Sequence, residues 1–211
     1  MKYFLFFVIF ALVAIPIYLI IKPIITEKYC RERLRSADPS DPELIPQLLR
    51  AFMPSGSVLT GISLPIPGKD GEEISYGTVA VNRAGIFIIS RICNEGLLEN
   101  PPGAGMWKLM TRGAVTEFPN PFKEQESPRR LLAYYANAAG VRDVKVHSLI
   151  VYTNGALRFS HPPSKGTIHA SVLHTRLRKA NAHGKLTARN LRAIIKTVKD
   201  VNAGIADISD A

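Results

Sequence analysis

An unbroken apolar run at the start of the chain is the feature that most restricts its fold. Every residue from Tyr3 to Ile21 is apolar or aromatic. A helix needs about 20 such residues to cross a hydrocarbon core of about 30 Å. A secretory signal peptide has a shorter apolar region followed by small residues, whereas this run is followed by Lys22 and Pro23. The run therefore predicts an uncleaved transmembrane helix, kinked at Pro16.

More cations follow this run than precede it. Only Lys2 and the terminal amine come before it, and the cations after it are Lys22, Lys28, Arg31, Arg33 and Arg35. Because segments rich in lysine and arginine stay in the cytoplasm, we expect a single-pass membrane protein with a cytoplasmic soluble domain, which contacts the lipid bilayer through residues 3–21. The same cations either rest on anionic headgroups or act only as a topology signal.

The chain length of 211 residues allows one ordinary domain and an anchor. We expect a membrane anchor and basic juxtamembrane segment at 1–35, a linker with a short helix at 36–57, and the folded domain at 58–211. Cys30 and Cys93 are too far apart to suggest a disulfide framework or a zinc knuckle, and the histidines lack metal-ligand spacing. The sequence therefore predicts no metal and no cofactor.

The soluble part alternates between strand and helix patterns, which predicts an α/β (α+β) fold with a mixed sheet flanked by helices. The run from Gly85 is apolar on both faces, as in a strand buried on both sides. The expected strands are Val58–Leu64, Ile74–Val81, Gly85–Cys93, Met106–Met110 and Val144–Tyr152, with short extended pieces near Leu157 and at Ala170–Leu173. The expected helices run from about Lys123 to Ala139, ended by Gly140, and onward from an N-cap at Thr187.

The last helix carries a basic ridge, which we define as Arg189, Arg192, Lys196 and Lys199. The four fall within about 80° of arc on a helix of 3.6 residues per turn. With a net charge of +10, this ridge makes phosphates of nucleic acid or anionic phospholipid the candidate partners. The alternative is that the ridge is only a solvated surface.

The ordered features between Val58 and Phe159, about half of the chain, resemble the NERD (nuclease-related) domain family, within the broad PD-(D/E)XK nuclease fold. The residues that carry the resemblance are Gly85-Ile86-Phe87-Ile88-Ile89, Gly96, Trp107, Asn120-Pro121, Gln125 and the strand Val146 to Tyr152. The resemblance implies a PD-(D/E)XK-like mixed sheet flanked by helices.

The resemblance also implies where an active site would lie. An active member carries an aspartate on the strand before the glycine turn, then a glutamate and a lysine two residues apart on the next strand. Side chains at i and i+2 share one face of a strand, so that both reach a metal ion and the scissile phosphate. These positions fall on Gly77, Ser90 and Ile92, while Gln125 is retained. Both carboxylates and the lysine are absent, which predicts a pseudo-nuclease.

We therefore expect a membrane-anchored, catalytically inactive nuclease-like domain that acts as a binding or scaffold module, with weak affinity for nucleic acid or anionic lipid. One alternative is a metal-dependent nuclease with relocated acids, for which Asp70, Glu72, Glu73 and Glu95 are candidates, and Glu43 lies near a family helix glutamate. Another is an organising role in which the domain docks a protein partner at the membrane.

Overall fold

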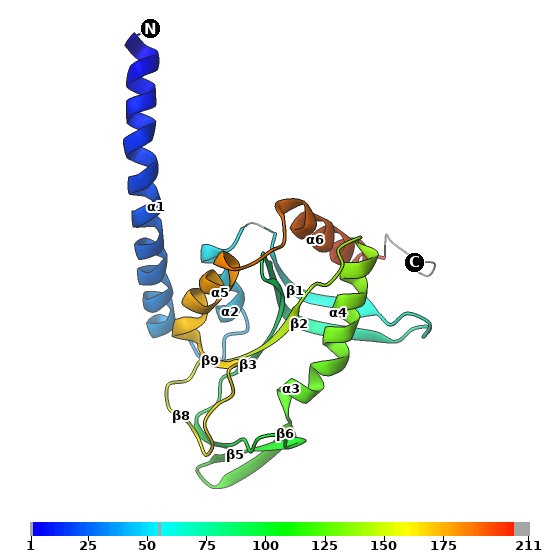
Figure 1. Ribbon diagram of the computed structural model, residues 1–211. Helices are drawn as coiled ribbons and strands as arrows, with labels where there is room; N and C mark the ends of the chain where they lie inside the picture. The colour runs from blue at the N-terminus through cyan, green and yellow to red at the C-terminus, as the bar shows by residue number, and fades with distance from the viewer. Residues whose placement is uncertain (1, 55, 205–211) are drawn as a thin grey trace.

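The computed structural model describes residues 2–54 and 56–204, except for the side chains at 2–9, 11, 13, 19 and 20. Figure 1 shows the arrangement of its helices and strands. The elements are α1 (Lys2–Ser36), α2 (Leu44–Phe52), β1 (Val58–Pro65), β2 (Glu73–Asn82), β3 (Gly85–Ile92), β4 (Gly96–Glu99), β5 (Met106–Thr111), β6 (Ala114–Pro119), α3 (Pro121–Glu124), α4 (Glu126–Ala138), β7 (Val146–Tyr152), β8 (Leu157–Phe159), β9 (Thr167–His169), a 3₁₀ turn at Ala170–Val172, α5 (Leu173–Ala182) and α6 (Ala188–Asn202).

The larger sheet has the strand order β1-β2-β3-β7-β9. β1, β2 and β3 are antiparallel neighbours, whereas β7 pairs parallel to β3, and β9 pairs parallel to β7. The parallel pairing requires a crossover between β3 and β7. That crossover contains three strands of the second sheet, β4, β5 and β6, and the helices α3 and α4.

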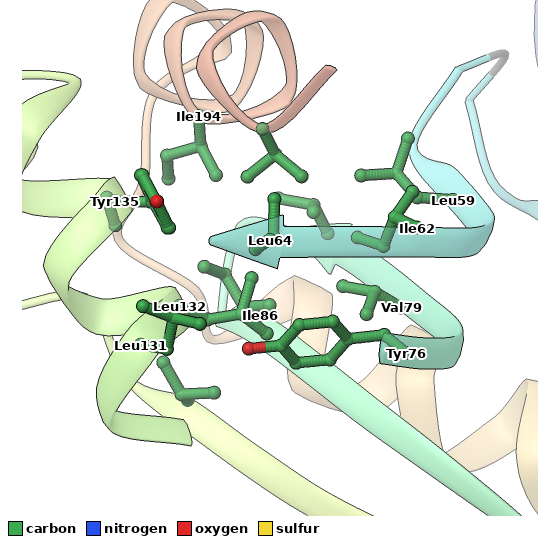
Figure 2. Close-up of a cluster of buried hydrophobic side chains, with 14 of the residues drawn as sticks. Leu59, Ile62, Leu64, Tyr76, Val79, Ile86, Leu131, Leu132, Tyr135 and Ile194 are labelled. Atoms are coloured by element: carbon green, nitrogen blue, oxygen red, sulfur yellow. The ribbon is translucent and has the colours of Figure 1, made fainter. Parts of the chain in front are cut away.

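Helices cover both faces of this sheet because its strands are apolar on both sides. On one face, α4 and α6 pack over Ile86 and Ile88 of β3. Figure 2 shows Ile194 of α6 above Leu64 of β1, and Leu132 of α4 beside Ile86. The opposite face, with Phe87 and Ile89, packs against α2, α5 and the second half of α1. The central sheet is therefore the middle layer of three.

The smaller sheet has the order β6-β5-β4-β8, with β8 parallel to β4 and the other pairs antiparallel. It has its own core around Trp107, Leu98 and Leu109. Ile92, at the end of β3, belongs to this third core. The end of β3 is thus the point where the two sheets meet.

Among the residues that the structure describes, none of the helices combines the length and the apolarity needed to cross a membrane. α1 extends away from the sheets (Figure 1), but it carries charged side chains from Lys22 onward, and its second half packs on α2. There Arg33 Nε donates to Gln47 Oε1 over 2.9 Å. The predicted transmembrane helix at residues 3–21 is therefore wrong for the described chain. The side chains at 3–9, 11, 13, 19 and 20 lie outside that description.

This finding corrects two further predictions. The expected single-pass membrane localisation with a cytoplasmic domain is overturned together with the helix. The expected fold class, which joined a transmembrane helix to one mixed sheet, is corrected to a mixed α/β structure with two mixed sheets and helices.

Two expected elements differ in the structure. The helix expected from Lys123 to Ala139 is divided into α3 and α4 at Gln125, where φ is −81° and ψ is 1°. The extended piece expected at Ala170–Leu173 is a 3₁₀ turn that leads into α5, and the His169 side chain accepts from the backbone N–H of Ser171 at its start. The buried side chains of α5, Leu173, His174 and Leu177, have helical spacing.

Gly85 controls the turn between β2 and β3, and we predict that Gly85→Ala lowers the free energy of unfolding by about 3 kcal/mol or more. The backbone has φ of 136°, and a Cβ would collide with the carbonyl of Lys145. Urea unfolding of the purified chain measures this loss.

Gly113→Ala is the matched control for this experiment. Gly113 also has a left-handed φ, 86°, but nothing lies within 4 Å of its added Cβ. It should lose only about 1 kcal/mol from backbone strain. Equal losses in the two variants would show that the approach of β3 to Lys145 is not tight.

Candidate functional site

The strands β2 and β3 pair over only part of their length, and a hollow opens where they separate. Their ladder runs from Asn82 opposite Gly85 to Thr78 opposite Ile89, and it stops there. β3 nevertheless continues beside β7 as far as Ile92, which lies opposite Tyr152. The residues of β2 and β3 beyond Thr78 and Ile89 are therefore free to face the space between the two strands.

The hollow has a volume of about 640 Å³. Gly77, Ser90 and Ile92, the three positions singled out by the family resemblance, all line it. The structure thus brings together residues from two strands that lie more than ten positions apart in the sequence. Its other lining residues come from β2 and β3 themselves and from the linker before α2, the start of α2, β1, β6 and α3: Pro42, Glu43, Ile45, Pro46, Thr60, Gly61, Thr78, Ile89, Arg91, Phe118, Pro121 and Glu124.

The absence of a side chain at Gly77 helps to keep the hollow open. A Cβ built at Gly77 meets nothing within 4 Å, so there is space for a larger residue. Ile92, by contrast, is only 7% exposed and packs into the core of the smaller sheet. One of the three positions is therefore open, and another is closed by apolar packing.

Gln125 does not line the hollow, but it contacts Ser90, the second of the three positions. Its Nε2 donates a hydrogen bond of 2.6 Å to Ser90 Oγ, and the residue is 5% exposed. The side chain of Asn120 holds the start of α3, because it accepts from Phe122 N over 3.0 Å and donates to Ala104 O over 2.8 Å. The break between α3 and α4 then places Gln125 against β3. Its Oε1 is buried without a partner among the described residues.

Arg91 is a residue of this site that the sequence reasoning missed. Its Nη1 donates to the carbonyls of Pro39 and Asp41, over 3.1 and 2.6 Å. Thr153 Oγ1 donates to the same Pro39 carbonyl over 2.8 Å. These bonds tie the linker before α2 to β3 and β7, and so fix the place of Glu43. The only signal in the sequence was a cation near the end of an otherwise mostly apolar strand.

The carboxylates in the lining are Glu43 and Glu124. Glu43 forms an ion pair of 3.0 Å with Arg50, and both side chains are about half exposed. The acids predicted as relocated ligands do not line the hollow: Glu72 pairs with Lys69 over 2.8 Å in the turn between β1 and β2, Asp70 lies in that turn, Glu73 begins β2, and Glu95 precedes β4. Within residues 2–54 and 56–204, no group of three or more His, Cys, Asp or Glu could hold a metal ion.

The chemistry available in the hollow follows from these groups. Two carboxylates can accept hydrogen bonds or share a hard cation, but such a cation normally has six or more oxygen ligands. Ser90 Oγ already accepts from Gln125, and the Arg91 guanidinium is bonded to carbonyls. Ile92, at the position where the family resemblance implies a lysine, contributes an apolar side chain to the lining.

The basic ridge lies elsewhere, on α6. Thr187 caps this helix as expected, because its Oγ1 accepts from Asn190 N over 3.2 Å. Ile194, Val198 and Val201 are buried against the sheet, while the four ridge cations are exposed. In the described part of the chain, none of the four forms an ion pair. The ridge and the hollow are separate candidate sites.

Comparisons with protein-family models, with curated proteins and with solved structures find no match for this chain.

A double-mutant cycle on Gln125→Met and Ser90→Ala should give a coupling free energy of about 1 kcal/mol, the usual net contribution of such a hydrogen bond. Gln125→Met alone should change stability little, because it also removes a buried amide oxygen without a partner. Urea unfolding of the four proteins measures the coupling.

Ser63→Ala provides the control cycle, since Ser63 bonds to Ser75 and shares no partner with Gln125. The losses of stability caused by Gln125→Met and by Ser63→Ala should be additive within about 0.5 kcal/mol. Additivity in the Ser90 cycle as well would mean that Gln125 is not held by Ser90 in solution.

Proposed function

We propose that this chain is a catalytically inactive nuclease-like domain, related to the NERD family, that acts as a binding or scaffold module. The observation that carries the proposal is that Gly77, Ser90 and Ile92 line one hollow, with Gln125 bonded to Ser90. The family resemblance implies this convergence of two strands and a helix glutamine. This arrangement supports the proposal of a family-like site that lacks the acids and the lysine.

The catalytic groups missing at the three positions would serve different parts of catalysis. In an active site of this kind, two carboxylates hold Mg²⁺, which activates water and neutralises developing charge. Glycine at 77 and serine at 90 supply no carboxylate, and serine alone is a poor ligand for a hard dication. Isoleucine at 92 removes the cation that would meet the transition state, where electrostatic stabilisation usually dominates the rate. Binding can persist where catalysis is lost.

The alternative proposal is a metal-dependent nuclease with relocated acids, and one observation favours it. Glu43 and Glu124 line the same hollow as the degenerate positions, although they come from different elements. If their carboxylates drew together on a shared cation, a substrate phosphate could complete its ligand shell. The ion pair of Glu43 with Arg50 opposes this, because it competes for the carboxylate.

The basic ridge supports affinity for phosphates within the proposed binding role. Exposed cations that have no acidic partner attract polyanions, and each phosphate contact releases bound counterions. We favour nucleic acid as the partner of the ridge, and anionic phospholipid is the alternative that the same experiment separates.

The full chain should show no Mg²⁺- or Mn²⁺-dependent cleavage of single-stranded, duplex or supercoiled DNA, or of RNA, and calorimetry should detect no tight site for either ion. The reason is the joint loss of both metal ligands and of the lysine. Gel assays with and without chelator measure the cleavage. Chelator-sensitive activity abolished by Glu43→Gln or Glu124→Gln would establish the relocated-acid enzyme instead.

Restoring the acids tests whether the positions are assigned correctly. Gly77→Asp combined with Ser90→Glu should confer measurable Mn²⁺ binding, since the space at Gly77 is open and both residues line the hollow. Gly155→Asp is the matched control, because it adds a carboxylate at a glycine with open space outside this hollow. If the double variant gained no more Mn²⁺ affinity than the control, the assignment of the family positions would fail.

Replacing the four ridge cations by Gln should flatten the salt dependence of polyanion binding. Each phosphate contact to duplex DNA contributes about 0.9 to the slope of log affinity against log salt, so losing four should lower it by about three to four. Fluorescence anisotropy with DNA and RNA, and sedimentation with anionic vesicles, measure the binding and identify the partner.

Arg112→Gln is the control for the ridge, because Arg112 is exposed at the turn between β5 and β6. Its removal should change the slope by at most about one. Unchanged binding in the fourfold variant, or no binding of the unmodified chain to any of these polyanions at low salt, would assign the ridge to solvation.

A further inference from the structure

A second hollow, of about 670 Å³, lies beside the start of β7. Its walls come from the turn between β2 and β3, from α3, α4 and α5, and from the loop before β9. β9 pairs with β7 only from Ile150 onward, so that the first residues of β7 have no strand on that side. The hollow thus occupies a gap at the edge of the larger sheet, away from Gly77 and Ser90.

Its lining is strongly basic. Arg129, Lys165, Arg176 and Lys179 all contribute, and no aspartate or glutamate lines the hollow. In the part of the chain that the structure describes, none of these four cations forms an ion pair. An adjoining hollow shares Arg129 and adds Arg130, Lys145 and one carboxylate, Glu126. The four cations of the second hollow therefore come from three separate segments, and no carboxylate lines that hollow with them.

Two buried polar atoms in the lining residues also have no partner among the described residues. They are His147 Nε2 and Ser148 Oγ. The imidazole of His147 is fixed, because it stacks on Phe87 with ring centres 4.7 Å apart and its other nitrogen bonds to the backbone of Ala84. Burial, followed by the nearby charges of Lys145, Arg129 and Arg176, lowers the pKa of His147. The lower pKa favours the neutral ring, and its Nε2 has no partner among the described residues.

We propose that this hollow is a binding site for a small phosphorylated molecule. Guanidinium and ammonium groups bind phosphate oxygens through short charge-assisted hydrogen bonds, and arginine does so through two parallel N–H groups. Ser148 Oγ and His147 Nε2 project to opposite faces of β7, so they would meet different parts of a ligand, Ser148 Oγ as a donor and His147 Nε2 as an acceptor. The proposal stands independently of the proposed nuclease-like function, since it uses none of the residues of that site.

The shape of the hollow favours a small molecule over a polymer. Its volume falls within the range of about 300 to 1,000 Å³ that is usual for small-ligand sites. Phe87, Phe122 and Leu149 supply an apolar side to the lining, as such sites generally have. The α6 ridge, by contrast, is a row of cations on one exposed helix, which suits an extended polyanion.

The test measures ligand affinity in the full chain after double substitutions at exposed cations, one pair in the hollow and one pair on the ridge. Inorganic pyrophosphate and adenosine monophosphate should bind and raise the melting temperature of the unmodified chain, whereas adenosine should not. Arg176→Gln combined with Lys179→Gln should weaken both phosphorylated probes by about tenfold or more, because each removes a charge-assisted contact. Calorimetry at low salt measures the affinities.

Two controls separate this site from general charge effects. Arg178→Gln removes an exposed cation from the same helix that does not line the hollow, and it should change the affinity by less than about twofold. Arg192→Gln combined with Lys196→Gln, on the ridge, should likewise leave both probes bound. Equal weakening by these controls, or no binding of either probe at millimolar concentration, would overturn the proposal.

The source of the phosphate is settled by two further probes. A single-stranded oligonucleotide and vesicles containing phosphatidic acid should not displace adenosine monophosphate, if the site takes a small soluble ligand. Displacement that is lost in the Arg176 and Lys179 double variant would overturn the small-molecule assignment in favour of a nucleic-acid or lipid phosphate.

Discussion

The burial of β3 on both faces is the constraint on which the rest of the structure depends. Ile86 and Ile88 face one helical layer, while Phe87 and Ile89 face the other. A strand that is apolar on both sides cannot lie at a solvent-facing surface, so both layers must form around it. The close approach of Gly85 to the Lys145 carbonyl fixes the register in which β3 pairs with β7.

The same strand determines where the two hollows open in the structure. At one end, β3 stays paired with β7 after β2 has turned away, and this divergence creates the hollow that contains Gly77 and Ser90. At the other end, β7 begins before β9 pairs with it, and the basic hollow fills that gap. Both hollows arise where the backbone ladder is incomplete, because strand edges and strand ends leave polar groups and space that a continuous sheet would close.

Uncompensated positive charge is the second general feature of the surface. The described ion pairs use Lys28, Arg31, Arg33, Arg50, Lys69 and Lys108. The ridge on α6 and the lining of the basic hollow have no such partners. With a net charge of +10, the chain repels itself at these places, and bound anions relieve that repulsion. In the two proposals made above, these surfaces of different shape bind phosphate-bearing ligands of different kinds.

Local sequence patterns determined the strands β1, β2 and β3 and the capped start of α6. Period-two apolar runs, the turn before Gly85 and the hydroxyl of Thr187 act within a few residues, so they are readable from the chain itself. The grouping of Gly77, Ser90, Ile92 and Gln125 was implied by the family resemblance and not by a local pattern. The local patterns did not predict the break at Gln125 or the helix α5, because those depend on what the segments pack against.

Only the tertiary structure decided which charged groups share a space. Glu43 and Glu124 lie far apart in the sequence but line one hollow, and Arg129 meets Arg176 across the start of β7. It also overturned the transmembrane helix that the apolar run had predicted, since no described helix is long and apolar enough to cross a membrane. Apolar periodicity reports which residues avoid water, whereas the convergence of polar side chains depends on long-range strand pairing, which no local pattern encodes.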